Sequence, residues 1–385
     1  MQSLSEKLGA PPEFLPAKTS PSLREVSLNI TVSTPMAGGG VIAGTVDEKR
    51  PLRVPSIRGH LRYWWRMMNL KSADKDKRES EIFGSTEKPG KVYADIPAQP
   101  DVSLRYCNND FDFKERYGPE MYALFSSRQN KQNIAREGFS FTLNIRYPEK
   151  YHDDVSLALS AWIYFGGIGA RTRRGCGSLS CDDVPLSLDD VLKSAPHITL
   201  WRKKPGGSNA RSAWSCAVQC YRDYRQNRNK GQGNRPGRSK WPEADSLRLL
   251  TGKFPERHKP REYLPLPSFP RAALGMPIIF QFPSDRRNEP DGVQVTPNID
   301  GSSRMASPVI TKALCDNGIW YSAAVILPHD DIFGTKLKLT AKLHVSNTPI
   351  ISMKSNQYSR LETTQGKTDA ISGFEEYISV KGWTK

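Results

Sequence analysis

The chain has 385 residues, and its 56 lysines and arginines against 40 aspartates and glutamates give a formal net charge of +16. This length suggests two domains with sizeable hydrophobic cores and excludes a mini-protein. No apolar run approaches the roughly 18–20 residues of a membrane-spanning helix, so no membrane segment is expected.

Residues 1–22 are rich in proline and serine and lack the apolar segment of a secretory signal, so we interpret them as a flexible leader. Six cysteines in so long a chain favour a reducing compartment, and we expect the protein to be cytoplasmic. The gaps between Cys176 and Cys181 and between Cys216 and Cys220 do not form compact metal-binding pairs. No metal or other cofactor is therefore expected.

Hydrophobic periodicity predicts a β-α-β-β-α-β order in the first half. Val26, Leu28, Ile30 and Val32 alternate with polar residues as in a half-buried strand. The predicted elements are strands at 24–33, 91–96, 138–147 and 178–181 and helices at 56–70 and 153–165. This order predicts a ferredoxin-like domain over residues 23–185, with an unassigned insertion at about 97–137.

The second half, residues 186–385, predicts another α+β unit after a boundary near residues 182–194. Its predicted elements are a helix at 211–225 and strands at 276–282, 304–313, 319–327 and 336–345. The expected fold class is therefore α+β, with two ferredoxin-like (RRM-like) domains that carry insertions. One insertion is strongly basic, because residues 202–261 contain 16 lysines and arginines and four acids. Within it, residues 226–240 resemble a flexible basic loop.

A glycine- and arginine-rich segment follows the second predicted helix. Its glycines permit positive φ angles and close approach of another backbone, and its arginines offer planar donors suited to phosphate. The alternative is a tight helix-to-strand connection with solvated arginines. The residues concerned are Gly167, Gly169, Gly175, Gly177, Arg171, Arg173 and Arg174.

This segment resembles the glycine-rich loop of the RAMP superfamily, the RNA-binding proteins of CRISPR systems. The likeness extends to Thr34-Pro35-Met36, the glycines at 38–40, and the segments 54–66 (VPSIRGHLRYWWR) and 81–84 (EIFG), which are similar to the first RAMP subunit of the type III-B (Cmr) effector complex. Further similar segments lie at 240–248, 269–278 and 304–308, so the resemblance covers about residues 32–314.

The resemblance implies a non-catalytic subunit near the 3′ end of the guide RNA that helps to admit target RNA in antiviral defence. The implied partners are the guide RNA (crRNA), single-stranded target RNA and other Cmr subunits. No residue is then expected to be catalytic. A structural protein whose charge only keeps it soluble is a third possibility.

The first predicted helix carries the first group of candidate RNA-binding residues. Arg58, Arg62 and Arg66 recur at i, i+4 and i+8, and no acids lie between them, so they predict a basic ridge that follows phosphates. An ordinary solvated face is the alternative. Trp64 and Trp65 could stack on bases, although at least one of them is expected in the core.

The other candidates are His60, Lys240, Trp241 and Arg304. Trp241 lies in the basic insertion and is the better candidate for base stacking, although Pro242 could simply begin a helix. His60 is expected to contact RNA. The alternative function is a RAMP endoribonuclease that processes guide precursors, with His60 as general acid or base.

Overall fold

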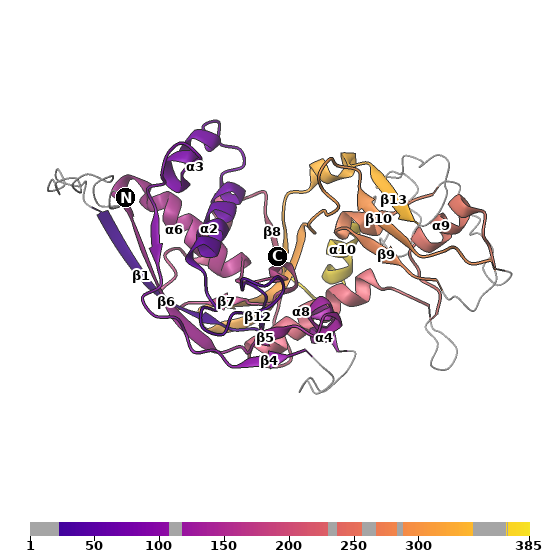
Figure 1. The fold of residues 1–385 in the computed structure, drawn as a ribbon, viewed down its shortest axis with the longest axis horizontal. Helices are drawn as coiled ribbons and strands as arrows, with labels where there is room; N and C mark the ends of the chain where they lie inside the picture. Colours follow the sequence, from indigo (N-terminus) through magenta and orange to yellow (C-terminus); the bar gives the residue numbers. More distant parts are fainter. Residues whose placement is uncertain are drawn as a thin grey trace, which may run out of the picture.

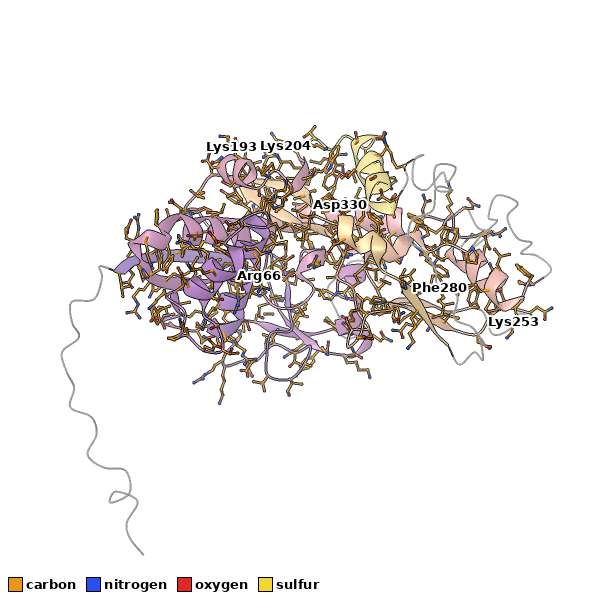
Figure 2. The ribbon with its side chains drawn as sticks, turned by 90° about the horizontal axis from the view of Figure 1, so that it is seen from above. Arg66, Lys193, Lys204, Lys253, Phe280 and Asp330 are labelled. Atoms are coloured by element: carbon orange, nitrogen blue, oxygen red, sulfur yellow. The ribbon has the colours of Figure 1, made fainter. Side chains whose placement is uncertain are left out.

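The computed structural model describes residues 23–107, 118–229, 237–255, 267–282, 288–341, 367 and 369–385. The predicted leader at 1–22 lies outside the described residues. Figure 1 shows an elongated molecule, with β1, β6, α2 and α6 at one end and β9, β10 and β13 at the other. Seen from above, Lys253 and Phe280 lie near the end remote from Arg66 of α2 (Figure 2). The mixed α+β class is confirmed.

The first half is built on a four-stranded antiparallel sheet with the order β3-β6-β1-β7. Leu28 lies opposite Leu143 and Ile30 opposite Phe141, and all four are buried because the alternating pattern turns them to one face. The strands are β1 (Leu23–Val32), β3 (Tyr93–Asp95), β6 (Phe139–Pro148) and β7 (Leu179–Ser180).

Two helices, α2 (Val54–Met68) and α6 (His152–Phe165), contact each other and share a core with these strands. The chain order β1, α2, β3, β6, α6, β7 agrees with the predicted elements to within two or three residues. The sheet order is also the one that a β-α-β-β-α-β unit requires. A further helix, α3 (Lys75–Phe83), lies against α2.

The insertion that the sequence left unassigned contains several short elements. A small sheet with the order β2-β5-β4 joins it to the loop after β1. The strands are β2 (Met36–Ala37), β4 (Leu104–Tyr106) and β5 (Asn133–Ala135), and the helices are α4 (Pro119–Ala123) and α5 (Phe125–Gln129).

The centre of the molecule holds another antiparallel sheet, β11-β12-β8, which lies between two hydrophobic cores. Ile310 and Val325 belong to the core of α2 and α6, whereas Val309 and Ile326 belong to the core of the second half. The elements here are α7 (Leu188–Ser194), β8 (Thr199–Lys203), α8 (Ala210–Arg225), β11 (Val309–Asp316) and β12 (Ile319–Ile326).

The far end contains a third sheet of three strands with the order β13-β10-β9. Its elements are α9 (Glu243–Thr251), β9 (Ile278–Phe280), β10 (Val293–Pro297), β13 (Leu337–Ala341) and α10 (Ala370–Ser379). Short 3₁₀ helices complete the described chain: η1 (Glu149–Tyr151), η2 (Thr172–Arg174), η3 (Pro270–Leu274) and η4 (Asp330–Gly334).

The strands of the second half thus divide between two sheets, because β8 pairs with β12 and β9 pairs with β10. The single four-stranded sheet of a second ferredoxin-like domain is not confirmed. The domain boundary near residues 182–194 stays a prediction. Within this boundary segment, α7 packs Leu188 and Val191 into the core of the first half.

Candidate nucleic-acid interface

A groove runs between α2 and the glycine-rich loop at residues 166–177, and we call it the α2–loop groove. It consists of two adjoining hollows of about 400 Å³ and about 180 Å³ that share His60. The first is lined by Met36, Gly39, Pro51, Arg53, Ser56, Gly59, His60, Ile168, Gly169 and Ala170. The second is lined by His60, Tyr63, Trp64, Phe165, Gly166, Gly167, Thr172, Arg173 and Ile310.

The apolar stripe of α2 orients the helix so that its small and polar residues face this groove. Trp64 and Trp65 are both buried, so the expectation that at least one is in the core is confirmed for both. The Trp65 indole also donates to Asp154 Oδ1 at 2.8 Å. Because both tryptophans are buried, neither presents a free face for stacking, although Trp64 contributes to the wall of the second hollow. Ser56 and Gly59 of α2 line the first hollow.

The arginines of α2 have partners within the chain. The Nε atoms of Arg62 and Arg66 donate to the two carboxylate oxygens of Glu79 on α3, and Arg58 donates to the carbonyl of Phe83. Burial opposes ionisation of Glu79, but the hydrogen bonds from both arginines outweigh burial and lower the pKa of its carboxyl. The expectation of a ridge without neighbouring acids is therefore wrong, because α3 supplies a buried carboxylate.

The glycines of the loop are required by its own close packing. Gly177 has a φ of +64°, and a Cβ there would lie 2.0 Å from the carbonyl oxygen of Ile168. A Cβ at Gly169, where φ is +82°, would lie 2.6 Å from the carbonyl of Ala37. The loop therefore folds on itself and against β2, and a Cβ at Gly167 or Gly175 would also lie too close to a neighbouring atom, at 2.8 Å and 2.6 Å.

The loop arginines attach the loop to four neighbouring segments. Arg171 donates to the carbonyls of residues 122 and 123, and Arg173 donates to the carbonyl of Ser307 and, at 3.2 Å, to the Tyr63 hydroxyl. Arg174 donates to the carbonyl of Val309 at 2.9 Å and to the Tyr221 hydroxyl at 2.6 Å. Their role in phosphate binding stays a prediction, and their observed contacts stabilise the fold.

His60 occupies the middle of the groove, where its ring stacks on Trp162 with a centroid distance of 6.2 Å and an interplanar angle of 11°. Burial lowers the pKa of the imidazole, so His60 is neutral at pH 7. Within the described residues its ring nitrogens have no hydrogen-bond partner. His60 can therefore offer a ring face and one neutral donor or acceptor to a ligand.

The candidates in the second half lie elsewhere. Trp241 is fully buried, and its indole donates to the carbonyl of Tyr224 at 3.1 Å, so it packs in the second core and cannot stack on RNA in this conformation. The hydrophobic neighbours of Trp241 in the second core, Tyr224 among them, rather than the charge of the basic loop, decide the position of Trp241. Lys240 is half-buried and Arg304 is exposed, and neither lines the α2–loop groove.

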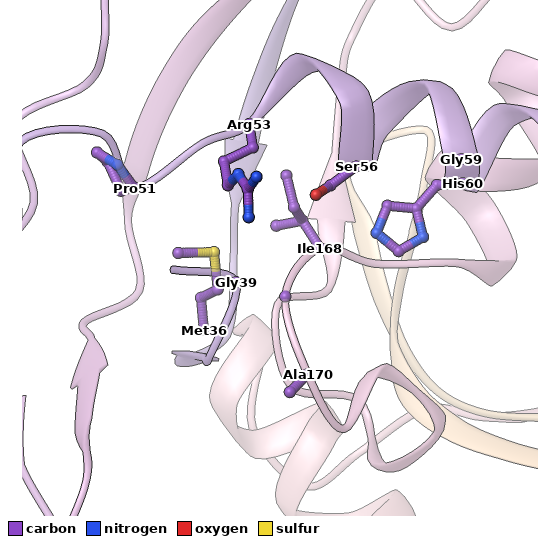
Figure 3. A pocket seen from close by; sticks show the side chains of 10 residues that line it. Met36, Gly39, Pro51, Arg53, Ser56, Gly59, His60, Ile168 and Ala170 are labelled. Atoms are coloured by element: carbon purple, nitrogen blue, oxygen red, sulfur yellow. The ribbon is translucent and has the colours of Figure 1, made fainter. Parts of the chain in front are cut away.

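Sequence reasoning missed Arg53 and Gly59. Arg53 directly precedes α2, its side chain is exposed, and it has no carboxylate partner within the described part of the chain. Figure 3 shows Arg53 directed towards Met36 and Gly39, with His60 and Ile168 on the other side of the hollow. The sequence contained a signal for Arg53, because it lies two residues before Pro55, and a proline at this spacing is typical of the first turn of a helix, whose amino end is positive.

These features make the groove suitable for an anion. No acidic residue lies in the first turn of α2, so its partial positive charge is not neutralised there. Arg53 adds a full charge, and Tyr63 and His60 add ring surfaces. The groove thus combines phosphate-binding and base-contacting groups.

No group of three histidines, cysteines, aspartates or glutamates that could hold a metal ion occurs in the described segments. Burial raises the pKa of the Cys107 thiol to about 11 and that of Cys176 to about 12, so both are protonated at neutral pH. Among the described helices, none is long and apolar enough to cross a bilayer.

Comparison with known protein families finds a match in the first half of the chain. The family model of the RAMP superfamily matches residues 29–180, which confirms the predicted resemblance over β1 to β7. No curated protein matches.

Solved structures extend the similarity. Apo Cmr1 from Pyrococcus furiosus aligns with 94% of this chain and 98% of its own, at 17% identity and a TM-score of 0.54, which indicates a shared fold. A chain of the type III-B Cmr-beta complex bound to cognate target RNA and AMPPnP aligns with 92% of this chain and 98% of its own, at 12% identity and a TM-score of 0.41. A chain of Cmr-beta bound to cognate target RNA aligns with 42% of this chain and 59% of its own, at 16% identity and a TM-score of 0.26.

Proposed function

We propose that this chain is a non-catalytic RNA-binding subunit of a type III-B CRISPR (Cmr) ribonucleoprotein, located near the 3′ end of the guide RNA, where it assists target capture. The match to the RAMP superfamily and the fold shared with Cmr1 support this proposal. The observation that carries it is the α2–loop groove, where Arg53, which has no carboxylate partner among the described residues, and a helix N-terminus without a side-chain cap meet the half-buried rings of His60 and Tyr63.

The proposal includes the architecture and the partners. Residues 23–185 form a ferredoxin-like RAMP domain, and residues 186–385 form a second domain with the basic insertion at about 202–261. The partners are the guide RNA, single-stranded target RNA and other Cmr subunits, in the cytoplasm. The strand order of the first sheet and the net charge of +16 support these assignments.

Binding in the groove would begin with phosphate. Arg53 and the positive end of the α2 dipole attract one phosphate, and Gly59 lets the RNA backbone approach the helix closely. His60 and Tyr63 then contact an unpaired base. Contacts of this kind hold the RNA without reading its sequence, so base pairing between guide and target supplies the specificity.

Measurement of RNA affinity for one substitution tests this proposal. Arg53→Gln should weaken the binding of single-stranded RNA in fluorescence anisotropy, because it removes the charge at the helix terminus. Arg24→Gln is the matched control, because Arg24 already forms an ion pair with Glu149 at 2.8 Å. Arg24 also lies far from the groove, since it is eight residues before Val32, the end of β1 nearer the groove, a distance of about 26 Å along the strand. Equal affinity of both variants and the wild type would contradict the proposal.

The alternative is an endoribonuclease that uses His60, and one observation favours it. The lowered pKa leaves His60 unprotonated at pH 7, as a general base requires. Guide-precursor and target RNA should be incubated with wild type and with His60→Ala, with and without divalent metal. The binding function predicts intact RNA in every sample. Site-specific cleavage by wild type that His60→Ala loses by more than about 100-fold would establish the nuclease instead.

A further inference from the structure

A second hollow, distinct from the α2–loop groove, lies between α4, α5 and the carboxyl end of α8, and we call it the α5–α8 cleft. Its volume is about 630 Å³, which is within the range of pockets that bind small molecules or single nucleotides. In Figure 1, α4 lies against α8 at the centre of the molecule. The cleft is lined by Gly118, Met121, Tyr122, Phe125, Arg128, Arg222, Asp223, Gln226, Asn227 and Arg228.

The walls of the α5–α8 cleft are fixed by polar contacts at its back. Arg211 of α8 donates from Nε and Nη2 to the two carboxylate oxygens of Glu120 on α4, both at 2.9 Å. Arg171 of the glycine-rich loop donates to the carbonyls of Tyr122 and Ala123. The bidentate ion pair with Arg211 and the hydrogen bonds from Arg171 therefore hold α4 in place. The wall of the cleft that α4 forms is fixed by the fold.

An exposed aromatic ring lies on one wall. Phe125 is 57% exposed, although it begins α5 and its neighbour Leu124 is fully buried. A phenyl ring that lines a pocket and remains exposed gains free energy when a planar group covers it. Tyr122 adds a second, half-buried ring.

The opposite wall is basic. Arg222 is oriented by Gln219, to which its Nη2 donates at 2.7 Å, and its Nε lies 3.7 Å from the Asp223 carboxylate. Arg228 is exposed, and its side chain has no ion pair with any residue that the structure describes. The lining thus carries three guanidinium groups, those of Arg128, Arg222 and Arg228, against one carboxylate.

We propose that the α5–α8 cleft binds one nucleotide of single-stranded RNA. Phe125 stacks on the base, the guanidinium group of Arg228 contacts a flanking phosphate, and the amides of Gln226 and Asn227 reach the base edge. This inference rests on the proposed RNA-binding function and adds a second contact site to it. A protein partner fits less well, because an exposed arginine beside an exposed aromatic ring matches a polyanion with planar bases.

The inference is tested by substitutions that change only the aromatic ring of Phe125. Phe125→Leu keeps the apolar side chain but removes the stacking face, and it should weaken single-stranded RNA binding by roughly fivefold or more. Phe125→Tyr keeps the face and should bind as wild type does. Ile279→Ala, at a residue that is 67% exposed on β9, controls for loss of an exposed apolar side chain. Circular dichroism melting checks that each variant folds.

The outcomes separate this inference from the proposed function. If wild type binds RNA and Arg53→Gln weakens binding while Phe125→Leu does not, the α2–loop groove remains and the cleft proposal is overturned. The cleft proposal is also overturned if Phe125→Leu keeps full RNA affinity but no longer copurifies with a neighbouring subunit, since the cleft is then a protein interface. If wild type binds no RNA, both proposals fail.

Discussion

Gly59 offers a test in which stability and binding should change in opposite directions. It lies within α2 and lines the α2–loop groove, and a Cβ built there has no protein atom within 4 Å. Packing therefore does not require a glycine at this position. A glycine inside a helix costs roughly 0.5–1 kcal/mol relative to alanine, so the chain retains an unfavourable residue at the edge of its candidate site.

We predict that Gly59→Ala raises the free energy of unfolding by about 0.5–1 kcal/mol, because the helix gains propensity and loses no contact. The thermal midpoint should rise by roughly 1–4 °C. Affinity for single-stranded RNA should fall by roughly twofold to tenfold, a loss similar in size to that of one net hydrogen bond, because the methyl group keeps the RNA backbone away from the surface of the helix.

The assays are urea denaturation for stability and fluorescence anisotropy for RNA affinity. Gly334→Ala is the matched control, since a Cβ there also has no protein atom within 4 Å and the residue lies in η4, outside the groove. It should leave RNA affinity unchanged. If Gly59→Ala stabilises the protein and RNA affinity stays the same, no ligand approaches this backbone and the reasoning is refuted.

Other predictions address stability and charge. Arg174→Ala should lower the free energy of unfolding by roughly 1.5–3 kcal/mol in urea denaturation, because Val309 and Tyr221 lose a charged donor; no change would mean that these contacts contribute nothing. Burial lowers the pKa of the Lys312 ammonium to about 7, whereas in the unfolded chain it is about 10.4, so the unfolded state holds more protons between these values and stability rises with pH across that window. Lys312→Met should flatten this rise, and an unchanged pH dependence would rule out Lys312 as its source. Trp241→Ala should cost roughly 3–5 kcal/mol of stability and leave the RNA affinity of the folded protein unchanged; a large loss of affinity without destabilisation would restore its stacking role. The plot of log K against log salt for single-stranded RNA should have a slope steeper than about −2, since several phosphate contacts contribute about −0.7 each, and a shallower slope would oppose an electrostatic interaction.

The strands and helices of the first half could be predicted because a local hydrophobic pattern determines the secondary structure of each segment. The alternation in β1 and β6 and the apolar stripe of α2 are local, and the sheet and helix that they predict are present. The glycine-rich loop was recognised from its spacing. Its glycines are crowded by the chain's own backbone, whereas Gly59, outside that loop, is the glycine with free space beside the groove.

Contacts between distant residues could not be predicted in the same way. Glu79 pairs with Arg62 and Arg66 only because α3 turns back along α2, and nothing in the spacing of the arginines reveals this. Trp241 lies in a basic stretch, yet Tyr224, 17 residues before it, sits with its ring perpendicular to the indole and buries it. The second half divides into two sheets for the same reason, since strand pairing depends on long-range contacts.

The most direct test of the RNA-binding assignment is photochemical crosslinking of the assembled ribonucleoprotein with separately labelled guide and target strands, followed by mass spectrometry of the crosslinked peptides. If the α2–loop groove binds RNA, crosslinks fall within residues 53–63 and 166–173, from one strand or from both. Crosslinks confined to other parts of the chain, with none in these two segments, would contradict the account.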